Sequence, residues 1–556
     1  MKLNGAEIII ECLKEQGVDT VFGIPGGTVI NIFDELHKHK AEIKNILTTH
    51  EQGASHAADG YSRATGKVGV CIATSGPGAT NLVTGIATAY MDSVPLVAIT
   101  GNVPISLLGK DSFQEVDIAG VTMPITKHNF IVKDVKDLAG IIRRAFYIAQ
   151  EGRPGPVLVD VPKDITANLT EYTYEKPREI IRAVADITEE DIEIAVDLIK
   201  NSKKPFIYTG GGTVFSGASD ELIKLVKKIN APVSSSMMGL GGFTGTDDLF
   251  TGMIGMHGSK ASNIAVTKCD LLIAIGVRFS DRVISNVEHF APDAQILQID
   301  IDPAEINKNI RTHHHIIGDI KEVLQLLNKM IEGKEKGEWY EEIMQIKKEH
   351  PLKYKEDDVL RPQHIIEKIY DMTNGEAIIA TEVGQNQIWA AQFYKYTKPR
   401  TFISSCGLGT MGYGTGAAIG AQIGMPDKQV FNIAGDGSFR MNCNELATAV
   451  YYNVPIIIAI MNNGTLGMVR QWQKMFYGGR FSETTLDRGP DFVLLAEAYG
   501  ATGYRVSKKE DIEIVLKKAL ESKGPVVIDF IVDIDEKVLP MVPPGQALEN
   551  IITEEI

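Results

Sequence analysis

Short β-rich apolar segments alternate with helical patterns along the whole chain. The clearest of these segments lie at 68–73, 94–100, 156–161, 205–209, 271–276, 296–301, 377–381, 430–434, 454–461 and 526–532. Strands that are joined through helices pair in parallel, because a parallel connection has to cross back over the sheet. The alternation therefore predicts an α/β fold built from doubly wound parallel sheets.

The 556 residues are too many for a single hydrophobic core. Two polar stretches, 166–190 and the Lys/Glu-rich 333–360, are typical of connections, although each could also form a surface helix. We expect three α/β domains at 1–165, 190–330 and 360–535, followed by a tail at 536–556.

An internal repeat supports this division. A shift of 360 positions aligns 51–95 with the last third of the chain without a gap. Ala57-Ala58 then falls on Ala417-Ala418, Gly60 on Gly420, and Glu51 on Met411. The repeat predicts that the first and third domains are related.

Charge and composition exclude several classes of partner. The net charge of −15, with no basic run, argues against a nucleic acid or an anionic membrane. No apolar stretch reaches the length of a membrane span, and we expect no targeting segment before the first helix. The five scattered cysteines favour buried thiols in a reducing, cytoplasmic compartment. The run 313–315 of three histidines predicts a solvated turn rather than a metal site.

The turn Gly435-Asp436-Gly437-Ser438 carries the strongest chemical signal. It follows a predicted strand, and Asn462-Asn463 follows the next one. Ends of neighbouring parallel strands meet at one sheet edge, and Mg²⁺ prefers carboxylate, amide and phosphate oxygens. Glycines let backbone N–H groups approach a phosphate. The spacing predicts a site for a magnesium-bound diphosphate.

With further motifs, the chain resembles the thiamine-diphosphate-dependent enzymes, and closely the biosynthetic acetohydroxyacid (acetolactate) synthase large subunits. The resemblance covers nearly the whole chain. Its motifs include His50-Glu51-Gln52-Gly53-Ala54, Thr74-Ser75-Gly76-Pro77-Gly78, Gly109-Lys110-Asp111-Ser112-Phe113-Gln114, Arg278-Phe279-Ser280-Asp281-Arg282, Gly407-Leu408-Gly409-Thr410-Met411 and Gly467-Met468-Val469-Arg470-Gln471-Trp472. It implies three domains that bind, in order, the pyrimidine of thiamine diphosphate, FAD, and the diphosphate.

The resemblance implies roles for the thiamine-site residues. Asp436, Asn463 and the carbonyl of Thr465 match magnesium ligands. Glu51 matches the acid beside the cofactor's pyrimidine, and Met411 matches the residue that props the bent cofactor. Asn386 stands where the family often has a histidine that contacts the diphosphate. The other expected contacts to this cofactor are Gly409, Gly437 and Ser438.

The resemblance also implies an FAD site in the middle domain. Glycines suit a pyrophosphate, and an acid at a strand end suits a ribose hydroxyl. Ser280 departs from the aspartate usual in the family, which leaves the isoalloxazine end less defined. The expected contacts are Arg153, Gly211, Gly212, His257, Gly258, Arg278, Asp300, Ile301 and Asp319.

For substrates, the resemblance implies decarboxylation of pyruvate and transfer of the hydroxyethyl carbanion to a second pyruvate or to 2-ketobutyrate, the first common step of branched-chain amino-acid synthesis. Arg282 and Trp472 match the second keto-acid site. Phe113, Gln114 and Lys163 match residues that line the channel from the partner subunit. The family implies a homodimer or tetramer with sites between subunits, and a small regulatory subunit.

Two alternatives stay open from the sequence. One is a sibling chemistry, either a pyruvate oxidase or a catabolic acetolactate synthase that lacks FAD. Arg282, Trp472 and the tail motif 540–545 favour the biosynthetic synthase. The other is a cofactor-binding scaffold without catalysis, which the presence of both Glu51 and Asp436 disfavours.

Overall fold

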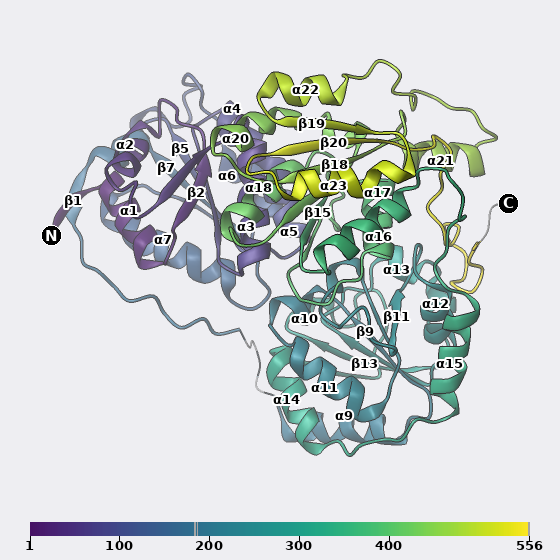
Figure 1. The fold of residues 1–556 in the computed structure, drawn as a ribbon. Coiled ribbons are helices and arrows are strands. Elements are labelled where there is room, and N and C mark those ends of the chain that lie inside the picture. The colour runs from purple at the N-terminus through teal and green to yellow at the C-terminus, as the bar shows by residue number, and fades with distance from the viewer. Residues whose placement is uncertain (183–184, 186, 554–556) are drawn as a thin grey trace.

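The computed structural model describes residues 1–182, 185 and 187–553. Part of the expected connection 166–190, at 183–184 and 186, lies outside the described residues. Three six-stranded parallel sheets with covering helices make up the chain, together with a small antiparallel pair, β1 (Lys2–Asn4) and β8 (Leu169–Glu171) (Figure 1). This arrangement confirms the predicted α/β fold class.

The first sheet lies in the N-terminal part of the chain. Its order is β3-β2-β4-β5-β7-β6, with strands at Lys44–Leu47, Thr20–Gly23, Gly69–Ala73, Leu96–Asn102, Pro156–Pro162 and His128–Ile131. Its helices are α1 (Gly5–Glu15), α2 (Ile30–Lys38), α3 (Glu51–Thr65), α4 (Pro77–Asn81), α5 (Val83–Met91), α6 (Ile118–Thr122), α7 (Val135–Gln150) and α8 (Lys163–Ala167).

The C-terminal sheet repeats this topology. Its order is β16-β15-β17-β18-β20-β19, with strands at Phe402–Ile403, Ile378–Thr381, Val430–Gly435, Ile457–Asn462, Val526–Ile531 and Thr502–Val506. Numbered from its own first strand, each of the two sheets runs 2-1-3-4-6-5. The helices are α16 (Pro362–Thr373), α17 (Gln385–Phe393), α18 (Gly414–Gly424), α19 (Asp436–Phe439), α20 (Leu446–Tyr451), α21 (Gly467–Phe476), α22 (Phe492–Tyr499) and α23 (Ile512–Leu520). The shared strand order agrees with the repeat seen in the sequence.

The middle sheet has the order β11-β10-β9-β12-β13-β14, with strands at Phe250–Met253, Val233–Ser235, Pro205–Thr209, Leu271–Ile275, Gln295–Asp300 and His314–Ile317. The helices are α9 (Glu189–Asn201), α10 (Gly211–Phe215), α11 (Ser219–Ile229), α12 (Lys260–Lys268), α13 (Asp281–Ile284), α14 (Ile320–Met330) and α15 (Glu338–Glu349). The expected connection 333–360 thus contains a helix, α15.

One expectation about the middle sheet is wrong. The histidines at 313–315 do not form a solvated turn, because His314 and His315 begin the edge strand β14. His313 Nδ1 accepts the backbone N–H of Ile296 at 2.9 Å. Strand pairing with β13 uses the backbone here, so three successive imidazoles are compatible with an edge strand.

Helices α3 and α18 lie side by side between the first and third sheets (Figure 1). A Cβ added to Gly60 would lie 2.1 Å from the carbonyl oxygen of Ala417, and one added to Gly420 would lie 1.8 Å from that of Ala57. Because the shift of 360 relates these two pairs to each other, the helices cross with local two-fold symmetry.

The C-terminal tail returns to the middle sheet. Val542 and Leu548 are buried in a cluster with Phe206, Leu272 and Phe279. Among the described residues, no helix combines the length and apolar character that crossing a membrane requires.

Candidate functional site

The predicted diphosphate turn lies at the carboxyl ends of two central strands of the C-terminal sheet. β17 and β18 pair in parallel with Gly435 opposite Met461. Asp436 and Asn463 therefore leave the same edge from adjacent strands, which lie about 4.8 Å apart in any sheet. Both side chains are buried.

Asp436 has an oxygen with no partner. Its Oδ2 is buried and accepts no hydrogen bond in the described part of the chain. Burial raises the pKa of this carboxyl to about 7. A buried carboxylate oxygen without a partner is costly unless a cation or donor completes it, so this position fits a metal ligand.

Asn463 and Thr465 lie beside it on the loop after β18. Asn463 Oδ1 accepts the N–H of Thr465 at 3.2 Å, and its Nδ2 donates to Gln385 Oε1 at 3.1 Å. The amide is thereby oriented and keeps one oxygen lone pair. No cluster of three His, Cys, Asp or Glu side chains suited to a metal occurs among the described residues, and the expected set of one carboxylate, one amide and one carbonyl needs none.

Two expected diphosphate contacts are already engaged. Asn386 Nδ2 donates to the carbonyls of Glu382 and Ile433, at 2.9 and 2.7 Å, so no amide hydrogen is left for a phosphate. The Ser438 hydroxyl donates to Glu382 Oε2 at 2.7 Å. The donors of both side chains are thus already used, against the expectation of an amide donor at Asn386, and the Ser438 oxygen also accepts the N–H of Gly412 at 3.0 Å. The donors of the turn are its backbone N–H groups.

Glu382, which the sequence argument did not single out, organises this edge. It follows β15 and is fully buried. Besides Ser438, it accepts the N–H of Gly412 at 2.9 Å and both the N–H and hydroxyl of Thr415. A charged residue directly after an apolar strand was the available signal, because such an acid is seldom buried without donors.

We call residues 405–413 the Met411 loop. It ends beside Glu382, and Asn442 Nδ2 donates to the carbonyl of Gly412 at 2.7 Å. Gly409 and Gly412 have φ values of +71° and +86°, a region that favours glycine. The loop therefore presents Met411 with its backbone fixed from the side of the diphosphate turn.

Glu51 begins α3. His50 caps the helix by accepting the N–H of Gln52, and Asn81 Nδ2 donates to Glu51 Oε2 at 3.0 Å. The backbone N–H groups of Thr49 and His50 donate to Glu445, which lies just beyond the diphosphate turn. The chain thus ties the segment before Glu51 to the C-terminal sheet, and Asn81 is a partner of Glu51 that the sequence argument missed.

A cavity of ≈ 2150 Å³ separates the middle sheet from the other two. It opens between β9 and β12, where the strand order reverses and where nucleotides bind in such sheets. Gly210 and Gly212 pack against Gly276 there. Of the residues expected to contact FAD, those that line the cavity are Arg153, Gly211, Gly212, His257, Arg278, Asp300, Ile301 and Asp319; Gly258 does not line it.

Several lining side chains are held by named partners. Arg153 forms ion pairs with Asp302 and Glu305, at 3.1 and 2.7 Å. His257 Nδ1 lies 3.1 Å from the carbonyl oxygen of Pro540, and burial lowers the pKa of His257 to about 4. Burial also raises the pKa of Asp300 to about 7. The cavity wall therefore combines exposed glycine backbone with polar side chains that their partners hold in place.

The expected substrate residues divide into two groups. Arg282 and Trp472 line the same cavity, together with Gly409 of the Met411 loop. The Arg282 side chain is 66% exposed, and it forms an ion pair with the adjacent Asp281, at 3.8 Å. Phe113, Gln114 and Lys163 lie outside the cavity; Phe113 is 87% exposed and Lys163 is exposed.

Comparison with known proteins identifies the family. Three thiamine pyrophosphate enzyme models match the chain: the N-terminal TPP binding domain at 3–121, the central domain at 192–327 and the C-terminal TPP binding domain at 382–530. A probable acetolactate synthase large subunit of Methanocaldococcus jannaschii is 47% identical, over 99% of this chain and 95% of its own. The acetolactate synthase large subunit of Corynebacterium glutamicum is 47% identical, over 99% and 90%. Acetolactate synthase 1 of Nicotiana tabacum is 46% identical, over 99% and 85%. The chain therefore belongs to the acetolactate synthase large-subunit family of thiamine pyrophosphate enzymes.

Proposed function

We propose that this protein is an acetolactate synthase that joins two keto acids with loss of CO₂. Pyruvate is the donor, and pyruvate or 2-ketobutyrate is the acceptor, which makes this the first common step of branched-chain amino-acid synthesis. The observation that carries the proposal is the buried, unpartnered oxygen of Asp436 beside Asn463 at the edge of a thiamine pyrophosphate domain.

The thiamine site uses the chain's own groups as follows. Asp436, the side-chain oxygen of Asn463 and the carbonyl of Thr465 hold Mg²⁺, and backbone N–H groups of Gly437 and Ser438 bind the diphosphate. Bound thiamine diphosphate supplies an electron sink for decarboxylation. Glu51 holds and moves a proton at the pyrimidine nitrogen, and Asn81 orients its carboxylate. Met411 and Gly409 would form part of the surface that supports the cofactor.

FAD is the proposed occupant of the large cavity. The volume of the cavity exceeds that of ordinary small-molecule pockets, about 300–1,000 Å³, and leaves room for a dinucleotide and a keto acid. Gly211 and Gly212 receive the pyrophosphate, and Asp300 accepts from a ribose hydroxyl. Arg282 binds the acceptor carboxylate, and Trp472 packs against its side chain.

The assembly is proposed from three residues outside the cavity, of which Phe113 and Lys163 are exposed and Gln114 is half-buried. Phe113, Gln114 and Lys163 lie outside the cavity, as expected if they complete the site of a partner subunit in a homodimer or tetramer. Several of the relatives, such as those of Haemophilus influenzae and Corynebacterium glutamicum, are named large subunits, which supports a small regulatory subunit as a further partner. We place the domains at 1–165, 190–330 and 360–535, with a tail at 536–556, and the protein in the cytoplasm.

The test is an assay of the purified protein with pyruvate, thiamine diphosphate, Mg²⁺ and FAD. The proposal expects one CO₂ and one acetolactate for each two pyruvates, and no turnover when thiamine diphosphate is omitted. Pyruvate-dependent reduction of a quinone or of oxygen would instead indicate a pyruvate oxidase. Acetolactate formation without any bound flavin would indicate the catabolic type of synthase.

A further inference from the structure

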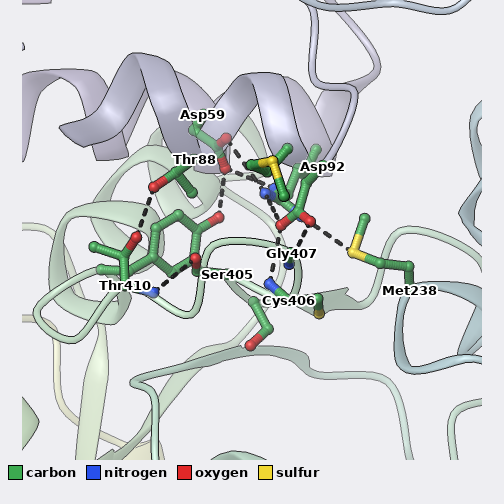
Figure 2. A network of polar contacts seen from close by, with 12 residues as sticks. Asp59, Thr88, Asp92, Met238, Ser405, Cys406, Gly407 and Thr410 are labelled. Carbon is green, nitrogen blue, oxygen red and sulfur yellow. Dashed lines mark hydrogen bonds and ion pairs between the residues drawn. The ribbon is translucent and has the colours of Figure 1, made fainter. Parts of the chain in front are cut away.

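A buried network of charges joins helix α3 and the end of helix α5 to the Met411 loop (Figure 2). Asp59 and Arg63 lie on α3, and Asp92 directly follows α5. Arg63 Nε donates to Asp59 Oδ1 at 2.6 Å, and its Nη2 donates to Asp92 Oδ2 at 2.9 Å. Neither carboxylate is exposed, and the guanidinium is nearly buried. We call these three residues the triad.

Each carboxylate of the triad holds one end of the loop. Asp92 accepts the N–H of Cys406 at 3.0 Å and that of Gly407 at 2.7 Å. At the other end, the hydroxyl of Tyr413 donates to Asp59. The triad thus brackets the loop on both sides of Met411.

Other contacts extend the bracket. The hydroxyls of Thr88 and Thr410 lie 2.8 Å apart, and Thr410 also donates its N–H to Ser405 (Figure 2). Arg63 Nη1 contacts the sulfur of Met238, which lines the large cavity, as do Asp92 and Gly407. The loop is therefore fixed at its start, middle and end by residues of helices α3 and α5 and by Asp92, directly after α5, beside the cavity.

The energetics argue for a role beyond stability. The triad buries two carboxylates against one guanidinium, and burying charge costs free energy that well-packed apolar residues would avoid. The triad instead fixes the orientation of the loop backbone, because charge-assisted hydrogen bonds hold the N–H groups of the loop more strongly than hydrogen bonds between neutral groups would. A fixed loop has a use at a cofactor site, where displacement of a contact by about 1 Å is costly.

We propose that Asp59, Arg63 and Asp92 are positioning residues that hold the Met411 loop in the conformation that binds thiamine diphosphate. The inference rests on the proposed thiamine site. The triad acts on the thiamine site through Cys406, Gly407 and Tyr413, and thereby sets the backbone on either side of Met411. Asp92 also lines the large cavity.

Tyr413→Phe is the most selective test, because it removes only the hydroxyl that donates to Asp59. The chain offers a matched control in α1 and the segment after β8. There Glu15 accepts from Arg143 through two nitrogens and from the hydroxyl of Tyr172. Tyr172→Phe therefore removes the same kind of bond from the same kind of ion pair, away from the loop.

Both variants and the wild type are titrated with thiamine diphosphate in Mg²⁺ buffer, following tryptophan fluorescence, and their Tm values are measured without cofactor. We expect Tyr413→Phe to raise the Kd for thiamine diphosphate about tenfold, the size of one lost charge-assisted bond. Tyr172→Phe should leave the Kd unchanged, and the Tm should fall by a similar amount in both variants. Equal Kd values for Tyr413→Phe and wild type would overturn the inference.

Asp92→Asn tests the other end of the loop. The amide lacks the charge and keeps one oxygen for three donors, so we expect a larger rise in Kd than for Tyr413→Phe, with KM for pyruvate unchanged at saturating cofactor. An unchanged Kd in a folded Asp92→Asn protein contradicts the inference. If that variant does not fold, Tyr413→Phe decides alone. Absence of binding by the wild type would instead refute the proposed function.

Discussion

At the scale of single residues, two buried acids at the diphosphate edge have opposite surroundings. Glu382 accepts hydrogen bonds from Gly412, Thr415 and Ser438, so both of its oxygens have partners within the protein. Asp436 keeps an oxygen that has no hydrogen-bond partner among the residues that the structure describes. The contrast separates an acid that orients its neighbours from an acid that is left free for a cation.

Glu51→Gln should lower turnover by about 10²-fold or more, because an amide cannot exchange a proton with the cofactor's pyrimidine. The Kd for thiamine diphosphate should change much less than turnover. Steady-state acetolactate formation and a cofactor titration measure the two quantities. Glu497→Gln, an exposed change on α22, is the control. Near-normal turnover of Glu51→Gln would remove this residue from its proposed role.

His56 predicts a dependence of stability on pH. Its ring is fully buried on α3, both nitrogens lack partners among the described residues, and burial lowers its pKa to about 3. As pH falls below about 6.5, the unfolded imidazole gains a proton that the folded one refuses, so stability is lost between about pH 6.5 and pH 3.

His56→Phe should remove this part of the acid sensitivity and keep the edge-on ring contact with Tyr413. Tm measured from pH 8 to pH 4 should show a variant that gains on the wild type as pH falls. His350→Gln, at an exposed position, serves as the control and should follow the wild type. Parallel curves for His56→Phe and wild type would show that the buried imidazole does not titrate as inferred.

At the scale of secondary-structure elements, the close packing of α3 against α18 depends on glycines at positions where a Cβ would clash with the facing backbone. Gly420→Ala should destabilise the protein by about 1–3 kcal/mol or more, because its Cβ would meet the backbone of Ala57. Gly140→Ala is the matched helical control. A Cβ there meets nothing within 4 Å, so helix propensity predicts a gain of about 0.5–1 kcal/mol. Chemical denaturation measures both, and a neutral Gly420→Ala would contradict the close packing.

The sequence predicted the central strands well and the short or peripheral ones poorly. β9, β12 and β17 are buried on both faces and read as apolar runs. By contrast, β16 has two residues, and β14 begins with histidines at the sheet edge, so neither carries an apolar pattern. Periodicity cannot find such strands, because their neighbours supply the pairing.

The same limit applies to the site. Asp436, Asn463 and Glu51 could be singled out as candidates because each sits in a short motif at a strand end or a helix start, and their roles remain predictions. No such motif marks Glu382, Asn81 or the triad, because their partners are distant in the sequence. Glu51 and Asn81 are 30 positions apart, and Asp59 and Tyr413 are 354 positions apart. Such roles follow from packing, which one sequence does not show.

At the scale of the whole molecule, the proposed site residues lie in separate parts of one chain, with Glu51 at the start of α3 and Asp436 directly after β17. If each site takes Glu51 from one subunit and Asp436 from the other, subunits carrying Glu51→Gln and Asp436→Asn should complement each other. Random pairing gives hybrids in half of the dimers, each with one intact site, so about a quarter of wild-type activity should return. Neither variant alone should reach this activity. No recovery on co-refolding would place both residues of a site in one chain.

The metal position is the most direct test of the whole account. Crystals grown with thiamine diphosphate and Mn²⁺ in place of Mg²⁺ would be measured for anomalous scattering. We predict a peak bonded to the free Asp436 oxygen, the Asn463 side chain and the Thr465 carbonyl, with Glu51 of a neighbouring subunit at the pyrimidine. A peak on other side chains, or bound cofactor without metal at Asp436, would contradict it.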